Sequence, residues 1–508
     1  MRQLLGFFAI LMLIPSACLD PLIKPADNTQ QYYREPYRPQ FHFSPKENWM
    51  NDPNGLVFYK GRYHLFYQYY PDSTVWGPMH WGHATSSDLT HWTHKPVALY
   101  PDSLGYIFSG SAVMDYKNTS GLGRKDKPAM IAVYTYHNME GERSGRKDYQ
   151  TQGIAYSLDE GLSWEKYAGN PVIANPGIKD FRDPKVFWHE PSERWILILV
   201  AGDHARIYRS KDLIDWTLVS SFGQSEGAHG GVWECPDLFP LITDQGEQKW
   251  ILSVSINPGG PNGGSATQYF VGDFDGITFT TDQKDIKWLD HGRDNYAGVT
   301  YNDAPDGQRI LLGWMSNWDY AQVTPTELWR SAMTLPRALG LKEDDSGFYL
   351  VQHPIVDTSI VGAAEKFTMD QLSAGLTLPL TPSHLQFDLN LGQNTVVELS
   401  NDLERFVFKV EPSKGQMSID RRASGAVAFS EQFAPELQTK EYTPEDRRAK
   451  VEIFCDASSV EIFVDSGRHV FTNQVFPNQS YTFLRIKTEQ QESGGLILAQ
   501  LKSIWYEQ

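Results

Sequence analysis

The feature that most constrains the fold is a long series of short apolar or aromatic runs between about residues 40 and 340, separated by Gly, Pro, Asp and Asn. The runs have strand length and are rich in β-branched and aromatic residues. Examples are residues 55–59 (GLVFY), 63–68 (YHLFYQ), 130–135 (MIAVYT), 195–200 (WILILV) and 250–255 (WILSVS). Since no long segment has convincing helical periodicity, we predict an all-β protein.

A degenerate repeat in this region narrows the choice of β architecture. Residues 87–92 (SDLTHW), 157–164 (SLDEGLSW) and 210–216 (SKDLIDW) share a Ser, an Asp and a later Trp, and residues 273–279 (DFDGITF) carry a weaker copy. The intervals between copies are uneven but have the size of a four-stranded blade with its loops. Such repeats are typical of a β-propeller, and five blades would fill residues 39–342.

A second domain is indicated by a change of pattern after the predicted propeller. Residues 343–365 begin with a turn-rich stretch and are interpreted as a linker. Beyond them, the alternation of apolar and polar residues becomes cleaner, as in 385–391 (LQFDLNL) and 460–464 (VEIFV). Period-two alternation gives each strand one buried face and one wet face, so we predict a β-sandwich over residues 366–508. We find no catalytic group of residues there and expect a supporting role.

The N-terminus has the features of an export signal. Within residues 1–18, a positive Arg2 precedes an apolar run, 4–14, that is too short to cross a bilayer as a helix. Small residues directly before Cys18 are typical of a bacterial lipoprotein signal, which predicts lipidation of Cys18; an ordinary secretory signal is the alternative. Residues 19–38 are polar and predict a flexible tether. We therefore expect an exported bacterial protein, periplasmic or on the cell surface, that meets a membrane only through this anchor.

Charge and cysteine content exclude several other classes. The formal net charge of −17 argues against nucleic acid or an anionic membrane surface as the main partner. After Cys18, only Cys235 and Cys455 remain, in different predicted domains, so no disulfide framework is expected. No Cys/His spacing indicates zinc, and we predict neither a metal nor a cofactor. The sequence does not reveal the oligomeric state.

Three acidic residues occupy settings that are poor for a surface charge. Asp52 lies in residues 49–55 (WMNDPNG), which also have the composition of a simple turn. Asp183 lies beside Arg182 before a predicted strand, where it could hold substrate hydroxyls or form a structural ion pair. Glu234 lies between Trp and Cys; folded inward it would be desolvated and would favour its protonated form, whereas pointing outward it would be an ordinary strand residue.

Considered together, the three acidic residues suggest acid/base and nucleophilic chemistry. A pair of carboxyl groups, one an ionised nucleophile and one a proton donor, is the usual requirement for cleaving a glycosidic bond. The three residues would lie on different blades, and propeller loops converge at one end of the central channel. The abundance of aromatic residues also suits stacking on sugar rings, although it suits β structure equally well.

With these segments in this order, the chain resembles glycoside hydrolase family 32, which comprises the invertases, inulinases and levanases, and is most similar to bacterial levanases. The resemblance extends from about Tyr37 to Arg337 and more loosely to the C-terminus. It implies a five-bladed propeller followed by a β-sandwich. It also implies a retaining hydrolysis of β-fructofuranosyl bonds, with a fructan or fructo-oligosaccharide as the partner and no cofactor.

The resemblance also implies roles for individual residues. Asp52 would be the nucleophile, Glu234 the general acid/base, and Asp183 the group that holds fructosyl hydroxyls in the transition state. Residues matching the family's sugar pocket are Asn51, Gln68, Trp76, Phe108, Ser109, Arg182 and Trp314. One departure concerns residues 294–297, which are Asp-Asn-Tyr-Ala here and Asp-Phe-Tyr-Ala in close relatives. We expect Asn295 near the mouth of the site, on the leaving-group side.

Several functions remain open at this stage. The leading one is release of fructose from levan-type β-2,6 fructan, with inulin and sucrose as further substrates. Endo-cleavage of levan to oligosaccharides and fructosyl transfer would use the same residues. A non-catalytic fructan-binding protein is the alternative from another class, and it is disfavoured because all three carboxylates are present.

Overall fold

The computed structural model describes residues 32–490 and 494–505, and it is almost entirely β. The two α-helices in this part of the chain are short, α1 (Met139–Arg143) and α2 (Met369–Ala374). Neither is long and apolar enough to cross a membrane, and no other helix of the described residues is. The predicted signal segment, Cys18 and the tether as far as residue 31 lie outside the described residues.

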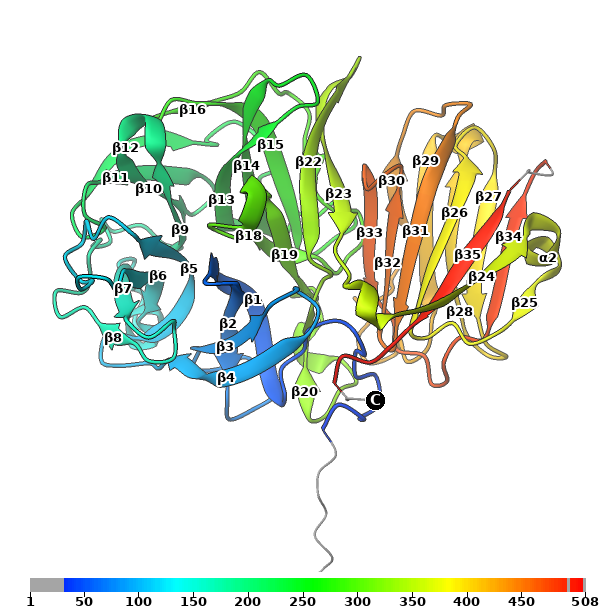
Figure 1. Ribbon diagram of the computed structural model, residues 1–508, viewed down its shortest axis with the longest axis horizontal. Coiled ribbons are helices and arrows are strands. Elements are labelled where there is room, and N and C mark those ends of the chain that lie inside the picture. Colours follow the sequence, from blue (N-terminus) through cyan, green and yellow to red (C-terminus); the bar gives the residue numbers. More distant parts are fainter. Residues whose placement is uncertain (1–31, 491–493, 506–508) are drawn as a thin grey trace, which may run out of the picture.

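The N-terminal part forms five sheets, each a meander of four main strands (Figure 1). The first contains β1 (Asn48–Tyr59), β2 (Arg62–Tyr70), β3 (His80–Ser86) and β4 (Trp92–Leu99). The second contains β5 (Tyr106–Asp115), β6 (Ala129–His137), β7 (Gln150–Ser157) and β8 (Glu165–Lys166). The third contains β9 (Phe181–His189), β10 (Arg194–Ala201), β11 (Ala205–Ser210) and β12 (Trp216–Phe222).

The fourth and fifth sheets each carry an additional short strand. The fourth contains β13 (Val232–Ile242), β14 (Gln248–Asn257), β15 (Ala266–Phe274), β16 (Phe279–Thr280) and β17 (Lys287–Trp288). The fifth contains β18 (Tyr296–Thr300), β19 (Ile310–Met315), β21 (Ala332–Met333), β22 (Arg337–Asp344) and β23 (Gly347–Pro354). The first strands of the sheets contact one another in a closed ring, in the order β1, β5, β9, β13, β18 and back to β1. The predicted five-bladed propeller is therefore confirmed.

The repeat found in the sequence is the turn between the last two strands of a blade. In three blades, a Ser hydroxyl accepts hydrogen bonds from backbone N–H groups of the turn, and an Asp carboxylate caps the residues that follow. In the first blade this Ser is Ser86, one residue before the motif at 87–92 that the sequence indicated. The indole N–H of the later Trp donates to a carbonyl of the same turn, at 3.0–3.1 Å, in Trp92, Trp164 and Trp216. The motif thus ends each third strand and starts the fourth.

The ring is closed by a segment from late in the chain. The short strand β20 (Trp329–Arg330) pairs in parallel with the start of β1, so that the first sheet has five strands. The Arg330 guanidinium anchors this segment by donating to the carbonyls of Thr324 and Thr326, at 3.0 and 2.8 Å. Blade one therefore contains residues from both ends of the propeller.

The C-terminal part is the predicted β-sandwich of two six-stranded sheets (Figure 1). One sheet contains β24 (Val361–Thr368), β35 (Gly495–Leu501), β26 (Ser383–Asn390), β31 (Arg448–Asp456), β32 (Ser459–Val464) and β33 (His469–Gln474). The other contains β25 (Leu376–Thr377), β34 (Phe483–Thr488), β27 (Thr395–Ser400), β28 (Arg405–Glu411), β29 (Gln416–Ala423) and β30 (Gln438–Glu441). Alternate side chains of both sheets form one apolar core between them.

Residues 343–365, which the sequence suggested as a linker, lie partly within sheets. The turn-rich stretch is the hairpin between β22 and β23, and β23 is still part of the fifth blade. The first sandwich strand, β24, begins at Val361. The chain between the two domains is therefore only residues 355–360. Both remaining cysteines, Cys235 and Cys455, are buried free thiols.

A buried charge network joins the two domains. His42 contacts Asp456 and Glu461 of the sandwich, each at 2.8 Å. Burial lowers the pKa of His42, but the bonds to these two carboxylates outweigh it and raise that pKa to about 9. Arg337 of the fifth blade contacts Glu461 at 2.6 Å and Asp290 at 3.1 Å. Buried ion pairs therefore connect the sandwich to the propeller.

Candidate active site

All five inner strands of the propeller have the same irregularity near their N-terminal ends. At this point two residues of the inner strand face one residue of the next strand, which is the pattern of a β-bulge. The bulged pairs are residues 51–52, 108–109, 183–184, 235–236 and 297–298. Asp183, Cys235 and Ala297 adopt left-handed backbone angles there, with φ of 62°, 47° and 53°. The bulged positions of all five inner strands therefore lie near the same end of the central channel.

A cavity of about 270 Å³ opens at this end of the channel. Nine of the ten side chains that the sequence singled out line it: Asn51, Asp52, Gln68, Trp76, Phe108, Ser109, Arg182, Asp183 and Glu234. Lining residues that the sequence analysis did not identify are His137, Glu142, Gln150, Asp180, Trp318 and Gln322. The tenth predicted residue, Trp314, is completely buried and is not part of the lining.

Asp52 is held by three side-chain donors. The Ser109 hydroxyl donates to one carboxylate oxygen at 2.6 Å, and the Asn51 amide donates to the other at 3.0 Å. Trp49 fixes that amide in turn, because its indole N–H donates to the Asn51 carbonyl oxygen at 2.8 Å. The Cys235 thiol also donates to Asp52, at 3.5 Å. The segment therefore lies within β1 and is not the simple turn that its composition allowed.

Asp183 lies on the other side of Cys235. The Cys235 backbone N–H donates to the Asp183 carboxylate at 3.0 Å, and the thiol lies 3.7 Å from the same oxygen. Burial and the surrounding carboxylates raise the pKa of the thiol well above its usual value, so it remains a neutral donor. Cys235 thus lies between the two carboxylates and donates a hydrogen bond to each.

Arg182 is the cation of the site. Its guanidinium group donates to Glu234 at 3.0 Å and to Asp180 at 2.7 Å, and its Nε lies 3.7 Å from Asp183. The second oxygen of Glu234 accepts a short hydrogen bond from the Tyr296 hydroxyl. Glu234 therefore points into the cavity, held from two sides, and is not an outward-facing strand residue.

Burial dominates the electrostatics of the other two carboxyl groups. Desolvation, with a smaller contribution from the charge of Glu234, raises the pKa of Asp52, and the bonds from Ser109, Asn51 and Cys235 oppose this rise. Desolvation also raises the pKa of Asp183, to about 7, although the charge of Arg182 lowers it. The site therefore concentrates negative charge around a single guanidinium, an arrangement typical of functional sites.

Aromatic rings form one wall of the cavity. Trp76 and Phe108 meet edge to face, with ring centroids 6.0 Å apart. The other face of Phe108 stacks on His137 at 4.1 Å. In contrast, Trp314 lies one layer behind the cavity, where it packs on Trp318 with centroids 4.9 Å apart. Trp318 is the ring that reaches the lining, and it lies in the same segment as Trp314.

Asn295 does not lie at the mouth of the site, contrary to our expectation. The side chain is buried, donates to Asp290 at 3.1 Å and faces Gly313, at the domain interface. Its neighbour Tyr296, which directly precedes the bulged residues 297–298, is the residue that donates a hydrogen bond to Glu234. The exchange of Phe for Asn therefore alters the interface instead of the leaving-group side.

The residues that sequence reasoning missed had weak local signals. Asp180 precedes the Phe-Arg-Asp segment by one residue, and its contact with Arg182 could have been inferred from that spacing. Gln150 donates to His137 at 3.2 Å, and His137 contacts Glu142 at 3.1 Å. These three hydrogen-bonded residues belong to β6, β7 and α1, which contain none of the three acidic segments singled out in the sequence. Only the folded structure brings these residues to the cavity.

Comparison with known proteins gives matches along most of the chain. The family model "Glycosyl hydrolases family 32 N-terminal domain" matches residues 42–354, and "Glycosyl hydrolases family 32 C terminal" matches residues 354–503. The two models meet at the end of β23, where the strand pairing separates propeller from sandwich. Both parts of the fold are therefore accounted for by the same family.

Three characterised relatives are similar over most of the chain. A levanase of Bacillus subtilis is 44% identical over 93% of this chain and 72% of its own length. An extracellular exo-inulinase of Aspergillus awamori is 41% identical over 89% of this chain and 92% of its own length, and a crystal structure of exo-inulinase from this species superposes with a TM-score of 0.84. A fructofuranosidase of Schwanniomyces occidentalis, solved with fructose, is 31% identical over 93% of this chain and 100% of its own, with a TM-score of 0.83.

Proposed function

Because the chain belongs to glycosyl hydrolase family 32 and is a glycosidase that acts on fructans, we propose that it cleaves β-D-fructofuranosyl bonds with retention of configuration. Asp52 is the nucleophile, Glu234 the general acid/base, and Asp183 the group that holds fructosyl hydroxyls. The observation that carries this proposal is the convergence of these three carboxyl groups in one cavity around Arg182.

In the first step, a carboxylate oxygen of Asp52 attacks C2 of the fructosyl unit. The bond from C2 to the leaving oxygen breaks, and Glu234 gives its proton to that oxygen. The result is a fructosyl ester of Asp52 and a free alcohol. Ser109 and Asn51 hold the Asp52 carboxylate in place for the attack.

In the second step, Glu234 takes a proton from water as the water oxygen attacks C2. The ester bond breaks, Asp52 returns to its carboxylate form, and fructose leaves. Arg182 and Tyr296 orient the two oxygens of Glu234 throughout. Gln68, whose buried side-chain nitrogen has no hydrogen-bond partner among the described residues, supplies a donor for a fructosyl hydroxyl.

For the substrate, we propose levan-type β-2,6 fructan, with inulin and sucrose also cleaved and fructose released from chain ends. The Bacillus relative supports levan, and the Aspergillus relative, by its name an exo-inulinase, supports exo action. The cavity volume of about 270 Å³ favours a pocket that accepts a chain end over a long open cleft.

A time course on levan, inulin and sucrose, with products separated by chromatography, tests this assignment. Fructose alone from the earliest points supports exo action, whereas a ladder of oligosaccharides would establish endo cleavage. Products longer than the substrate would reveal fructosyl transfer, and binding without turnover would identify a binding protein. Proton NMR of freshly released sugar distinguishes retention from inversion at C2.

The chain is exported, in agreement with the Aspergillus relative, whose name describes it as extracellular. For Cys18 we propose lipidation after signal cleavage. Cell fractionation of wild type and Cys18→Ala tests this: the wild type should sediment with membranes and the variant should be released. Equal release of both proteins would favour an ordinary secretory signal.

A further inference from the structure

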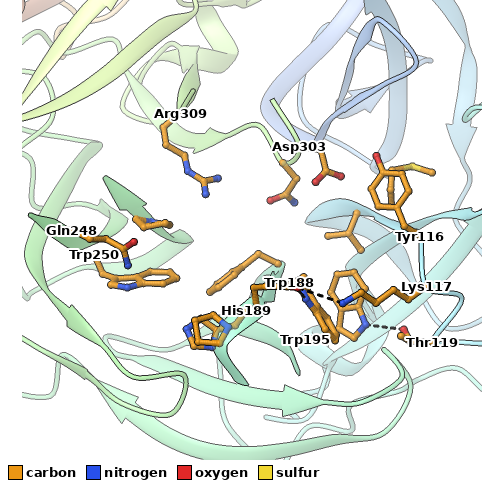
Figure 2. Close-up of a pocket in the computed structure, with 17 residues that line it drawn as sticks. Tyr116, Lys117, Thr119, Trp188, His189, Trp195, Gln248, Trp250, Asp303 and Arg309 are labelled. Atoms are coloured by element: carbon orange, nitrogen blue, oxygen red, sulfur yellow. Dashed lines mark hydrogen bonds and ion pairs between the residues drawn. The ribbon is translucent and has the colours of Figure 1, made fainter. Parts of the chain in front are cut away.

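Figure 2 shows a second cavity, of about 480 Å³. Its lining residues lie at the end of the inner strands opposite the candidate active site. In β9, Asp183 faces the active site, whereas Trp188, five residues further on, lines this second cavity. At about 3.3 Å per residue, these positions are roughly 16 Å apart along the strand. The cavity volume lies within the roughly 300–1,000 Å³ that is usual for small-molecule sites.

Buried polar groups fill the channel between the two cavities. Lys185 of β9 forms a buried ion pair of 3.1 Å with Asp237 of β13. The Asn302 amide donates to the carbonyls of Ala112 in β5 and Val186 in β9, at 2.8 and 3.0 Å, and so ties a third inner strand, β5, to β9. The second cavity is therefore a separate site and not an extension of the first.

Aromatic side chains from three blades line the second cavity. Trp188 and Trp195 of the third blade meet edge to face with centroids 5.2 Å apart, and Trp250 of the fourth blade lies on another wall. The Trp195 indole is fixed by a hydrogen bond of 2.8 Å to Thr119. Tyr116 stands at the rim with 59% of its surface exposed. Broad ring faces of this kind suit the apolar faces of sugar rings.

Charged groups of both signs surround these rings. Lys117 and Arg309 are the cations, and Glu190 and Asp303 are the anions. Lys117 lies 4.5 Å above the Trp188 ring and 3.6 Å from Glu190. Among the described residues, neither the Asp303 carboxylate nor the Arg309 guanidinium has a hydrogen-bond partner. Balanced charge favours a neutral ligand, and unpaired donors and acceptors favour one that carries hydroxyl groups.

We propose that this cavity is a second carbohydrate-binding site, which holds the enzyme on a fructan polymer while chain ends are cleaved at the other end of the propeller. The choice of fructan rests on the function proposed above, whereas the choice of a neutral carbohydrate rests on the rings and charges of the cavity itself. Two sites on one molecule increase its residence on a polymer without any change in the chemistry.

The test uses the double variant Tyr116→Ala/Asp303→Ala, because both side chains are exposed and their loss should leave the fold intact. A matched control is Asp402→Ala/Leu403→Ala, which removes an exposed carboxylate and an exposed apolar side chain from the sandwich. Binding is measured by electrophoresis through gels containing levan or inulin, with Glu234→Gln present in every protein to prevent digestion. Kinetics are measured with Glu234 intact.

We expect the Tyr116/Asp303 variant to lose most of its retardation in a fructan gel, while the control keeps it. With Glu234 intact, KM for the polymer should rise about three- to tenfold, a small part of what linked sites can contribute. kcat/KM for sucrose should not change. Equal retardation and equal polymer KM for variant and wild type would overturn the proposal, as would equal losses on sucrose and polymer.

Failure of the proposed function gives a different result. In that case the wild type would cleave neither sucrose nor fructan, yet the electrophoresis could be repeated with gels of starch, xylan and other neutral polysaccharides. Retardation that the Tyr116/Asp303 variant loses would support a carbohydrate site for another sugar. No retardation of the wild type in any gel would overturn the site itself.

Discussion

Arg182 and Glu234 lie on the inner strands of neighbouring blades, and the Arg182 guanidinium donates to the Glu234 carboxyl group at 3.0 Å. The same guanidinium is bonded to Asp180 and lies close to Asp183. One cation therefore orients the acid/base proposed here and also balances the charge of its neighbours.

Replacement of Arg182 tests this shared role. Arg182→Gln should lower kcat/KM at least about 100-fold, the size expected when a preorganised electrostatic group is lost. The charge of Arg182 lowers the pKa of Asp183, so its removal should raise that pKa. The acidic limb of the pH–rate profile should then move to higher pH. Arg182→Lys, which keeps the charge, should leave that limb in place; an identical shift in both variants would contradict this explanation.

Substitution of either proposed catalytic residue should lower the rate, but the two variants should differ in how strongly the rate depends on the leaving group. Asp52→Asn should lose several orders of magnitude in rate on every substrate, because no ester can form. Glu234→Gln should lose as much on sucrose but far less on an activated aryl fructoside, whose leaving group needs no proton. Rates on the two substrates give the comparison, and near-wild-type turnover of sucrose by either variant would overturn the assignment.

Asp183 is predicted to reduce stability at neutral pH. Its pKa is about 7 in the folded protein, against an ordinary value of 3.8, so the folded state holds a proton that the unfolded chain releases. The free energy of unfolding therefore falls as pH rises from about 4 to 7. Asp183→Asn should remove this fall and be more stable at pH 8, by up to about 4 kcal/mol, although nearly inactive. Denaturant unfolding at pH 4 and pH 8 measures the difference, and equal differences at the two pH values would contradict the prediction.

Two adjacent arginines in the sandwich provide a matched pair. Arg421 is buried and binds Asp294 and Tyr320 of the propeller, the latter at 2.8 Å. Arg422 is exposed, and its guanidinium binds Asp420 alone among the residues that the structure describes. Arg421→Gln should destabilise the protein by about 3–5 kcal/mol, because the buried charge of Asp294 would lose its ion-pair partner. Asp294 would keep only the hydrogen bonds that the Tyr320 hydroxyl and the Gln474 backbone N–H donate to it. Arg422→Gln should cost less than about 1 kcal/mol.

The same pair tests whether the sandwich supports catalysis. Asp294 lies two residues before Tyr296, which donates to Glu234. Loss of Arg421 should therefore lower kcat in protein that is still folded, whereas loss of Arg422 should not. Activity measured well below the unfolding transition checks this expectation; unchanged kcat in Arg421→Gln would show that the sandwich contributes stability alone.

Asn295 should influence stability and not the product pattern. Asn295→Ala removes the 3.1 Å bond to Asp290, which keeps its bonds to Arg337 and Thr472. The expected loss is about 1–2 kcal/mol. Chromatography of levan digests should give the same products as the wild type, and a changed product ladder would restore the idea that residue 295 acts at the site.

Much of the fold followed from local pattern. Strand-length runs and the Ser-Asp-Trp repeat identified the blades, because the repeat is itself a hydrogen-bonded turn that closes on its own residues. The cleaner alternation of apolar and polar residues after the propeller identified the sandwich. The hairpin at residues 344–347 was less informative, because a turn within a sheet and a linker between domains share the same residue types.

The site was predictable where its residues lie in one segment and less so where it depends on contact between segments. Residues 51–52 looked like a turn, since a bulge inside a strand uses the same Asn, Asp and Pro that turns use. Trp318 and Trp314 could not be distinguished, because which ring reaches the cavity depends on how the chain bends after β19. The contact of Tyr296 with Glu234, 62 residues apart, has no local signal at all.

Because β20 pairs with β1, the first blade cannot be completed until late in the synthesis of the chain. Asp52 is made early, but the edge of its blade is completed only by residues 329–330. A nascent or truncated chain that ends before this segment lacks the closing strand, three strands of the fifth blade and the sandwich, although every carboxyl group of the site is already present. The enzyme should therefore gain activity in a single late step, and proteolytic fragments ending before residue 329 should be inactive.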